Sequence, residues 1–113
     1  MNIPEDAVLV RIFVGEQDMH QRIPLYEAIV MKAREQNIAG ATVLKGVMGY
    51  GASSRVHTTK ILRLSEDMPM VIELVDSEAH MQPLLQWLET VVDSGLITME
   101  KIRVHRYGNR NKS

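Results

Sequence analysis

The sequence has 113 residues, of which 45% are hydrophobic and 24% are charged, and its formal net charge is −1. This near-neutral charge argues against a general nucleic-acid binder, and the lack of cysteine excludes disulfides, thiol catalysis and cysteine-ligated metal sites. No apolar run approaches 18 residues, and the first ten residues lack the basic flank and cleavage site of a secretory signal, so we expect a cytoplasmic protein without membrane insertion.

The first half of the chain predicts a strand, a helix and a second strand. Apolar residues in 7–14 fall on both faces of a strand, which therefore needs cover on two sides. Pro24 suits the first turn of a helix over 25–37, and Gly40 is expected to end that helix. The apolar, β-branched run at 42–48 predicts the second strand.

The second half predicts a long loop, a strand, a helix and a last strand. Residues 50–69 are too many for a hairpin turn, and residues 70–75 follow as the third strand. Ser77 is the expected N-cap of a helix in which leucine, methionine and valine recur at helical spacing, and Gly95 is expected to cap its end. Residues 98–107 predict the fourth strand.

This order, β-α-β-β-α-β, predicts an α+β, ferredoxin-like fold: a four-stranded antiparallel sheet with two helices on one face. We expect one domain over 1–113, with flexible ends at 1–6 and 109–113. Two helices leave the second face of the sheet open, although apolar side chains such as Leu9 and Phe13 lie there. Another copy of the chain is the simplest cover, so the sequence predicts a homo-oligomer.

The segment 40–60, GATVLKGVMGYGASSRVHTTK, is a candidate anion or phosphate site. An apolar strand runs into a glycine-hinged loop that carries hydroxyls and cations, Arg55 and His57 among them. Backbone N–H groups beside a glycine can approach an oxyanion closely. The segment is neither a Walker motif nor a dinucleotide fingerprint, so a long surface hairpin without a ligand stays an open alternative, as does a solvated role for His57.

Five segments of the chain resemble a known family: VRIFVGEQD, PLYEAIV, AGATVLKGVMGYGASSRVHT, LRLSEDMPMVIELVD and ITMEKIRVHRYG. Over residues 8–108 the sequence is similar to the PII signalling superfamily, and more closely to its uncharacterised PII-like family, domain of unknown function 190. The resemblance implies a homotrimer whose sheets face a central axis. It also implies a sensor that binds an adenine nucleotide in clefts between subunits and regulates an unidentified protein partner through the loop 50–60.

The resemblance assigns seven positions to the ligand: Gly40 and Thr42 beside the base, Gly49, Tyr50 and Gly51 around the phosphates, and Lys101 and Arg103 as cations that reach the phosphates from the start of the fourth strand. Ile102 is expected to face the core, which places Lys101 and Arg103 on the opposite face. Thr98 and Glu100 stand where the superfamily pattern has glycines. A carboxylate there would repel phosphates if it pointed inward, so we expect a less charged adenine ligand or a different anion rather than tightly bound ATP.

Two other functions of this architecture remain as alternatives. A small ferredoxin-like hydrolase would need a phosphate-cradling loop after the first strand, and the segment GEQDMHQR does not match one, so we assign no catalytic residue and expect no enzymatic activity. A divalent-cation tolerance-type trimer is the second alternative. The four histidines are scattered, with no pair at i,i+4, so we expect no metal site and no required cofactor.

Overall fold

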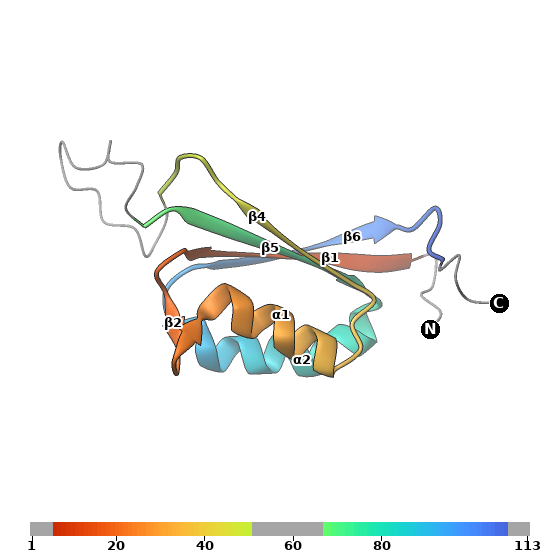
Figure 1. Ribbon diagram of the computed structural model, residues 1–113. Coiled ribbons are helices and arrows are strands. Elements are labelled where there is room, and N and C mark those ends of the chain that lie inside the picture. Colours follow the sequence, from red (N-terminus) through yellow and green to blue (C-terminus); the bar gives the residue numbers. More distant parts are fainter. Residues whose placement is uncertain (1–5, 51–66, 109–113) are drawn as a thin grey trace.

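The computed structural model describes residues 6–50 and 67–108, which form one antiparallel sheet with two helices packed on one of its faces (Figure 1). The elements in chain order are β1 (Asp6–Gly15), β2 (Met19–His20), β3 (Ile23–Pro24), α1 (Leu25–Glu35), β4 (Gly40–Lys45), β5 (Pro69–Asp76), α2 (Glu78–Val91) and β6 (Leu96–Arg103). The main sheet has the strand order β4-β5-β1-β6, and β2 pairs with β3 in a short hairpin. The predicted α+β, ferredoxin-like fold is confirmed. Neither helix in these ranges is long and apolar enough to cross a membrane.

The core lies between the sheet and the helices. Alternate residues of β1 and β5 point toward the helices, and their side chains are almost completely buried there. They meet the apolar stripes of α1 and α2, and the largest fully buried side chains are Val8, Val10, Ile12, Ile29, Ile72, Leu74, Met81, Leu84 and Leu88. Each such side chain contributes roughly 1.5–3 kcal/mol to folding. The predicted core face of the first strand and the predicted apolar stripe of the second helix are therefore confirmed.

The first helix ends earlier than predicted. α1 stops at Glu35, and Asn37 adopts the left-handed conformation with a φ of 58°. The amides of Asn37 and Ile38 each donate to a carbonyl of the last turn at 3.0 Å, which is a Schellman-type ending. Asparagine tolerates this conformation because its short polar side chain can hydrogen-bond locally. Gly40 is therefore not the helix stop, and it is instead the first residue of β4.

The second helix confirms the predicted start and corrects the predicted end. Ser77 Oγ accepts the amide of His80 at 3.1 Å, as an N-cap does. α2 ends at Val91, before Gly95 is reached. Gly95 stands directly before β6, where a Cβ would lie 2.5 Å from the carbonyl oxygen of Phe13. Glycine is therefore required there by the close approach of β1, not by helix capping.

Both edge strands begin and end earlier in the sequence than predicted. The structure has Gly40–Lys45 where 42–48 was predicted, and Leu96–Arg103 where 98–107 was predicted. β4 ends where its partner β5 begins with Pro69, whose ring nitrogen has no proton for a further ladder bond. β6 ends at Arg103, which pairs with Asp6, the first residue of β1. Pairing partners from elsewhere in the chain therefore set the ends of both strands.

Candidate ligand-binding site

The predicted ligand residues lie at opposite ends of the sheet. Gly49 and Tyr50 follow β4 at one end, and Lys101 and Arg103 close β6 at the other (Figure 1). β1 runs between the two ends, and its ten residues span about 30 Å. A single chain therefore does not bring the glycine turn and the cations together.

The glycine turn belongs to a narrow stem at one end of the sheet, formed by residues 46–50 and 67–69, which we call the loop stem. The amide of Gly46 donates to the carbonyl of Pro69 at 2.8 Å, and a Cβ on Gly46 would come within 2.7 Å of the proline ring. Glycine thus allows the two sides of the stem to touch. Tyr50 is 80% exposed at the end of the stem. The remaining predicted loop residues lie outside the described part of the chain: Gly51, Arg55 and His57.

Carboxylates beside the loop stem are engaged by the protein itself. Glu16 accepts from Lys45 Nζ at 3.0 Å, and Asp67 Oδ1 accepts the amide of Gln17 at 2.9 Å. Within 6–50 and 67–108, no group of three or more histidine or acidic side chains is placed to hold a metal ion. Asp67 therefore ties the loop stem to the segment that follows β1, and Glu16 ties that segment to the end of β4.

The cations of β6 face the helix side of the sheet, which corrects the predicted strand faces. Lys101 pairs with Val8, whose side chain is in the core, and Ile102 pairs with Ala7. Directly paired residues of antiparallel strands share a face, so Lys101 and Arg103 lie on the helix side and Ile102 on the open side. Both cations are exposed there, and they come at the end of the strand rather than at its start.

Glu100 points away from Lys101. Its carboxylate accepts from Arg11 Nη1 at 2.8 Å on the open face, where Arg11 Nε also donates to Glu73 at 3.0 Å. The hydrogen bond to Glu73, reinforced by the negative charges of both carboxylates, raises the pKa of Arg11 above its ordinary value, so the guanidinium keeps its charge. The repulsion of phosphates that the sequence predicts for an inward-pointing Glu100 therefore does not act on a ligand at Lys101.

A cleft of about 390 Å³ opens beside Lys101, between the start of β1, the end of β6 and the first turn of α2. Its lining consists of Asp6, Ala7, Val8, Glu78, Lys101 and Ile102. Two carboxylates, Asp6 and Glu78, thus share the cleft with one ammonium group. On its own this cleft is not a phosphate site, because the carboxylates oppose a second negative group. An anion here needs further donors from outside the chain.

Gly40 and Thr42 occupy the opposite edge of the sheet from Lys101. They lie on the open face of β4, where Gly40 pairs with Val75 and Thr42 pairs with Glu73. Three strand spacings, about 14 Å, separate β4 from β6. A Cβ on Gly40 would lie 4.0 Å from the Cβ of Val75, so packing does not require glycine at this position. The contact of these two residues with a base stays a prediction.

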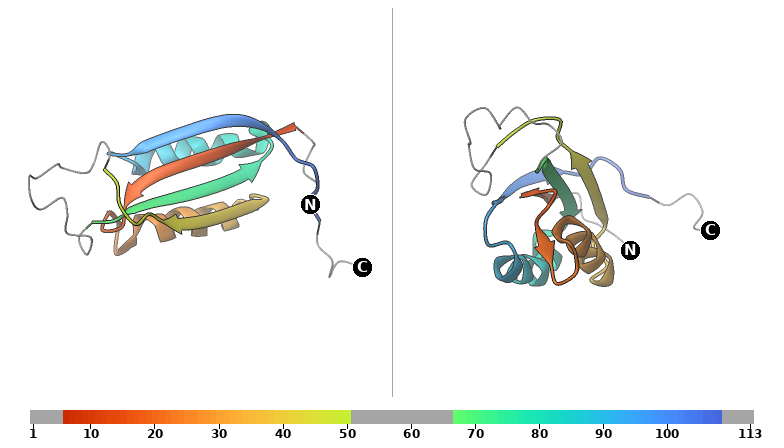
Figure 2. Two further views of the ribbon diagram at one scale, coloured as in Figure 1. Left: turned by 90° about the horizontal axis from the view of Figure 1, so that it is seen from above. Right: turned by 60° about the vertical axis from the view of Figure 1, so that its left-hand side comes forward.

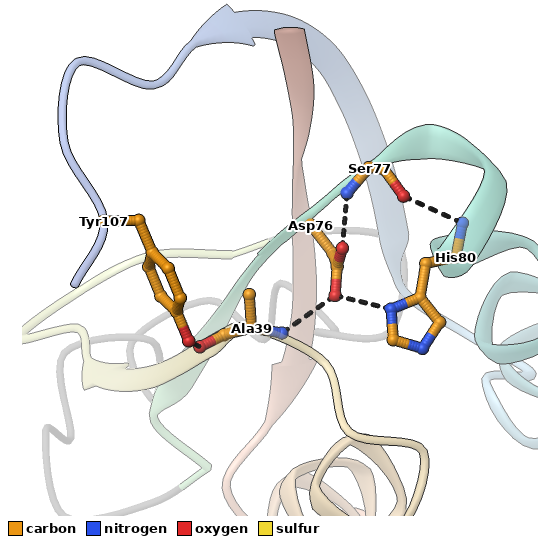
Figure 3. Close-up of polar contacts among 5 residues, drawn as sticks. All are labelled: Ala39, Asp76, Ser77, His80 and Tyr107. Carbon is orange, nitrogen blue, oxygen red and sulfur yellow. Dashed lines mark hydrogen bonds and ion pairs between the residues drawn. The ribbon is translucent and has the colours of Figure 1, made fainter. Parts of the chain in front are cut away.

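One polar cluster joins residues that no sequence pattern brings together. It consists of Asp76 at the end of β5 with Ala39, Ser77, His80 and Tyr107, and we call it the Asp76 cluster (Figure 3). Asp76 is only 2% exposed. Its carboxylate accepts the amides of Ala39 at 2.9 Å and Ser77 at 2.6 Å, and it pairs with His80 Nδ1 at 2.8 Å. The Tyr107 hydroxyl donates to the carbonyl of Ala39 at 3.0 Å, so the cluster joins β5, α2, the α1–β4 connection and the C-terminal segment.

The sequence matches a described family over most of its length. Residues 7–104 match the family DUF190, whose description is "Uncharacterized ACR". The chain belongs to the DUF190 family. A UPF0166 protein of Methanocaldococcus jannaschii is 34% identical over 101 residues, which cover 88% of this chain and 93% of that protein. A UPF0166 protein of Aquifex aeolicus is 31% identical over 96 residues, which cover 85% and 90% of the two chains.

Solved structures of PII-like proteins share the fold of this DUF190 chain. CPII from Thiomonas intermedia K12, bound to ADP, AMP and acetate, is similar with a TM-score of 0.66 at 16% identity, over 94% of each chain. A putative PII-like signaling protein from Thermus thermophilus has a TM-score of 0.60 at 18% identity, over 92% of this chain and 93% of its own. The predicted membership in a PII-like family is therefore confirmed, and at these identities the structural likeness establishes the fold.

The open face of the sheet is apolar around Arg11 in this DUF190 protein. All four strands contribute side chains to this face: Leu9, Phe13, Leu44, Val71, Val75 and Leu96. Leu44 and Leu96 are about half exposed, at 49% and 53%. Exposed apolar side chains that adjoin one another across a sheet typically mark a site of interaction with another molecule.

Proposed function

We propose that this protein is a PII-like sensor without enzymatic activity, which binds an adenine nucleotide or a related anion in clefts between copies of the chain. The observation that carries the proposal is the placement of the loop stem and of Lys101 and Arg103 at opposite ends of one sheet. A ligand that needs both must take them from two chains. A head-to-tail contact, with the stem of one copy against the β6 end of the next, supplies both.

The assembly that we propose is a homotrimer. A repeated head-to-tail contact either closes into a ring or continues as a filament. The apolar open face favours the ring, because copies arranged around one axis bury these surfaces against each other. The resemblance to the PII superfamily supports three as the number of copies.

The charges of the β6 end support an anion of low charge. Lys101 and Arg103 supply two cations, whereas Asp6 and Glu78 line the adjoining cleft and oppose a large negative charge. CPII from Thiomonas intermedia K12 is bound to ADP and AMP in one structure, and to ADP and bicarbonate in another. We therefore propose ADP or AMP, in preference to ATP, as the ligand of this chain.

The resemblance to the PII superfamily supports the remaining proposed contacts. The loop stem supplies backbone N–H groups at Gly49 and Tyr50 to the phosphates, and the base meets β4 at Gly40 and Thr42. The loop residues Gly51, Arg55 and His57 complete the cleft. Binding changes the loop 50–60, which then regulates a protein partner, as ligand-ordered loops do in other switches.

Titration calorimetry against ADP, AMP and ATP, with the mass in solution measured by light scattering, tests the proposal. We expect a trimer that binds ADP or AMP and leaves the nucleotide chemically unchanged. Arg34→Ala on α1 is the charge-matched control for substitutions of Lys101 and Arg103, and it should bind as the wild type does. A protein that binds none of the three nucleotides, or converts one of them, contradicts the proposal.

A mixing experiment tests whether two chains share one ligand. Gly46→Val forces the two sides of the loop stem apart, because a Cβ there would lie 2.7 Å from the ring of Pro69. Lys101→Ala combined with Arg103→Ala removes the cations of the β6 end, so each variant alone should bind weakly. After the two variants are refolded together in equal amounts, about one quarter of the clefts join an intact stem to intact cations. Binding should return in that fraction. A mixture that binds no better than its parents would exclude a shared cleft.

A further inference from the structure

The C-terminal segment 104–108, which we call the C-terminal strap, crosses the end of the sheet from one edge strand to the other. It leaves β6, and at Tyr107 it reaches the connection between α1 and β4 (Figures 2 and 3). The hydroxyl of Tyr107 donates to the carbonyl of Ala39 at 3.0 Å. The strap thus joins the two sheet edges that the strand order keeps furthest apart.

Ala39 is held from two sides. Its amide donates to Asp76 Oδ2 at 2.9 Å, and its carbonyl accepts the bond from Tyr107. Asp76 is 2% exposed, whereas Tyr107 is 48% exposed (Figure 3). The inner bond therefore fixes Ala39 to the core, while the outer bond can open without stranding a buried carboxylate. The C-terminal strap therefore makes a reversible contact with Ala39, which Asp76 holds in place.

The position of this contact along the chain links two ligand half-sites. The strap begins directly after Arg103, at the cation end of β6, and Ala39 directly precedes β4. β4 in turn leads into the loop stem. In the proposed ring, the cation end and the stem of one chain belong to two different clefts.

We propose that the hydrogen bond between Tyr107 and Ala39 couples the two clefts that each chain serves, an inference that rests on the proposed function. A nucleotide held by Lys101 and Arg103 orders the strap, the strap holds Ala39, and β4 carries the change toward the stem at the next cleft. Coupling between binding sites is reciprocal, so a nucleotide at the stem also orders the strap. Successive nucleotides then bind one ring with unequal affinities.

The first arm of the test uses ligand-free protein. Tyr107→Phe removes only a hydroxyl, and Tyr26→Phe removes a hydroxyl from the first turn of α1, at the other end of the helix from Ala39. Amide hydrogen exchange is measured at residues 39–42 and 101–103. We expect exchange about five-fold faster at both segments in Tyr107→Phe, the factor that one neutral hydrogen bond contributes. Tyr26→Phe should exchange as the wild type does, and unchanged exchange at 39–42 in Tyr107→Phe overturns the inference.

The second arm adds saturating ADP. In the wild type, ADP should slow exchange at both 39–42 and 101–103, and calorimetry should resolve unequal sites. In Tyr107→Phe, the slowing at 101–103 should persist, the slowing at 39–42 should disappear, and the sites should become equal. Slowing at 39–42 that survives in this variant means direct contact with ADP and overturns the coupling. A wild type that binds no nucleotide refutes the proposed function, and the first arm then decides separately whether the strap and β4 open together.

Discussion

Glu100 and Lys101 are neighbours in β6 and point to opposite faces of the sheet. Glu100 reaches Arg11 on the open face at 2.8 Å, while Lys101 lies opposite the core residue Val8. Because side chains alternate along a strand, two adjacent residues of opposite charge serve two separate surfaces. The ammonium group of Lys101 lines the cleft at the end of β6. The carboxylate of Glu100 pairs with Arg11 among the apolar side chains of the open face.

This alternation predicts different outcomes for substitutions at adjacent positions. Lys101→Ala should weaken ADP binding by about 10- to 100-fold, the size of a lost charge-assisted hydrogen bond, and Arg103→Ala should weaken it without unfolding the chain. Glu100→Gln should change ADP affinity by less than about three-fold, because Arg11 holds its carboxylate on the other face. Calorimetry of the purified variants measures all three. A large gain of affinity in Glu100→Gln would mean that this carboxylate faces the ligand.

The Asp76 cluster predicts a large loss of stability from a substitution of nearly equal shape. Asp76→Asn replaces one of the two carboxylate oxygens with an NH₂ group, so either the amide of Ala39 or the amide of Ser77 loses its acceptor. We expect the free energy of unfolding to fall by roughly 2–4 kcal/mol, because one buried amide loses its acceptor and faces an NH₂ group instead. Urea denaturation measures this loss. Glu78→Gln, in the exposed first turn of α2, is the control and should stay within about 0.5 kcal/mol of the wild type; equal midpoints for both variants would refute the role of the cluster.

Two glycines form a matched pair for a test of packing. A Cβ on Gly95 would lie 2.5 Å from the carbonyl oxygen of Phe13, whereas one on Gly40 would lie 4.0 Å from the Cβ of Val75. Gly95→Ala should therefore lower the free energy of unfolding by roughly 1–3 kcal/mol. Gly40→Ala should change it by less than about 1 kcal/mol, because alanine fits there and restricts the unfolded chain. Thermal unfolding compares the two, and equal losses would contradict the assigned close approach at Gly95.

Because Gly40→Ala is expected to fold, it also tests a predicted ligand contact. If the backbone of β4 approaches the base at this position, the added methyl group should weaken ADP binding while the melting temperature stays near that of the wild type. Calorimetry measures the affinity. An unchanged affinity would remove Gly40 from the site and leave the rest of the proposed cleft standing.

The two ion pairs of Arg11 predict how the proposed trimer responds when the positive charge of Arg11 is removed. Arg11→Leu leaves Glu73 and Glu100 without their partner among apolar side chains. Burial of two unpaired carboxylates between copies is unfavourable, so the trimer should dissociate at higher protein concentrations than the wild type. Replacing all three residues with leucine should restore association, since no charge is then left unpaired. Sedimentation velocity measures both variants, and a triple variant that stays monomeric would place the interface elsewhere.

The sequence predicts the fold because local patterns agree with the global arrangement. The alternation of apolar residues in β1 and their helical spacing in α2 each predict which face is buried. Ser77 indicates the start of α2. β6 is different, because large apolar side chains fall on both of its faces: Ile97 pairs with Ile12 of the core, and Ile102 with Ala7 of the other face. Only the register of β6 with β1 decides on which face Lys101 lies, and this register cannot be predicted from the periodicity of β6 alone.

The candidate site is predictable only in part. Residue types and the resemblance select Lys101, Arg103 and the glycine turn, but chain order does not say that they lie at opposite ends of the sheet. The sequence contains even less indication of the Asp76 cluster. Tyr107 and Ala39 are 68 positions apart, and their contact depends on a strap that crosses the end of a folded sheet.

Gly46 and Pro69 clamp the chain where it leaves the domain and where it returns. The segment between the two sides of the stem is therefore joined to a base whose ends are already held together. Lengthening a loop on such a base is inexpensive, since each doubling of its length costs only about 0.6 kcal/mol of closure entropy. In this protein, the length and sequence of the segment 51–66 can thus change at little cost to the free energy of folding, because the pairing of β4 with β5 is already fixed at the stem.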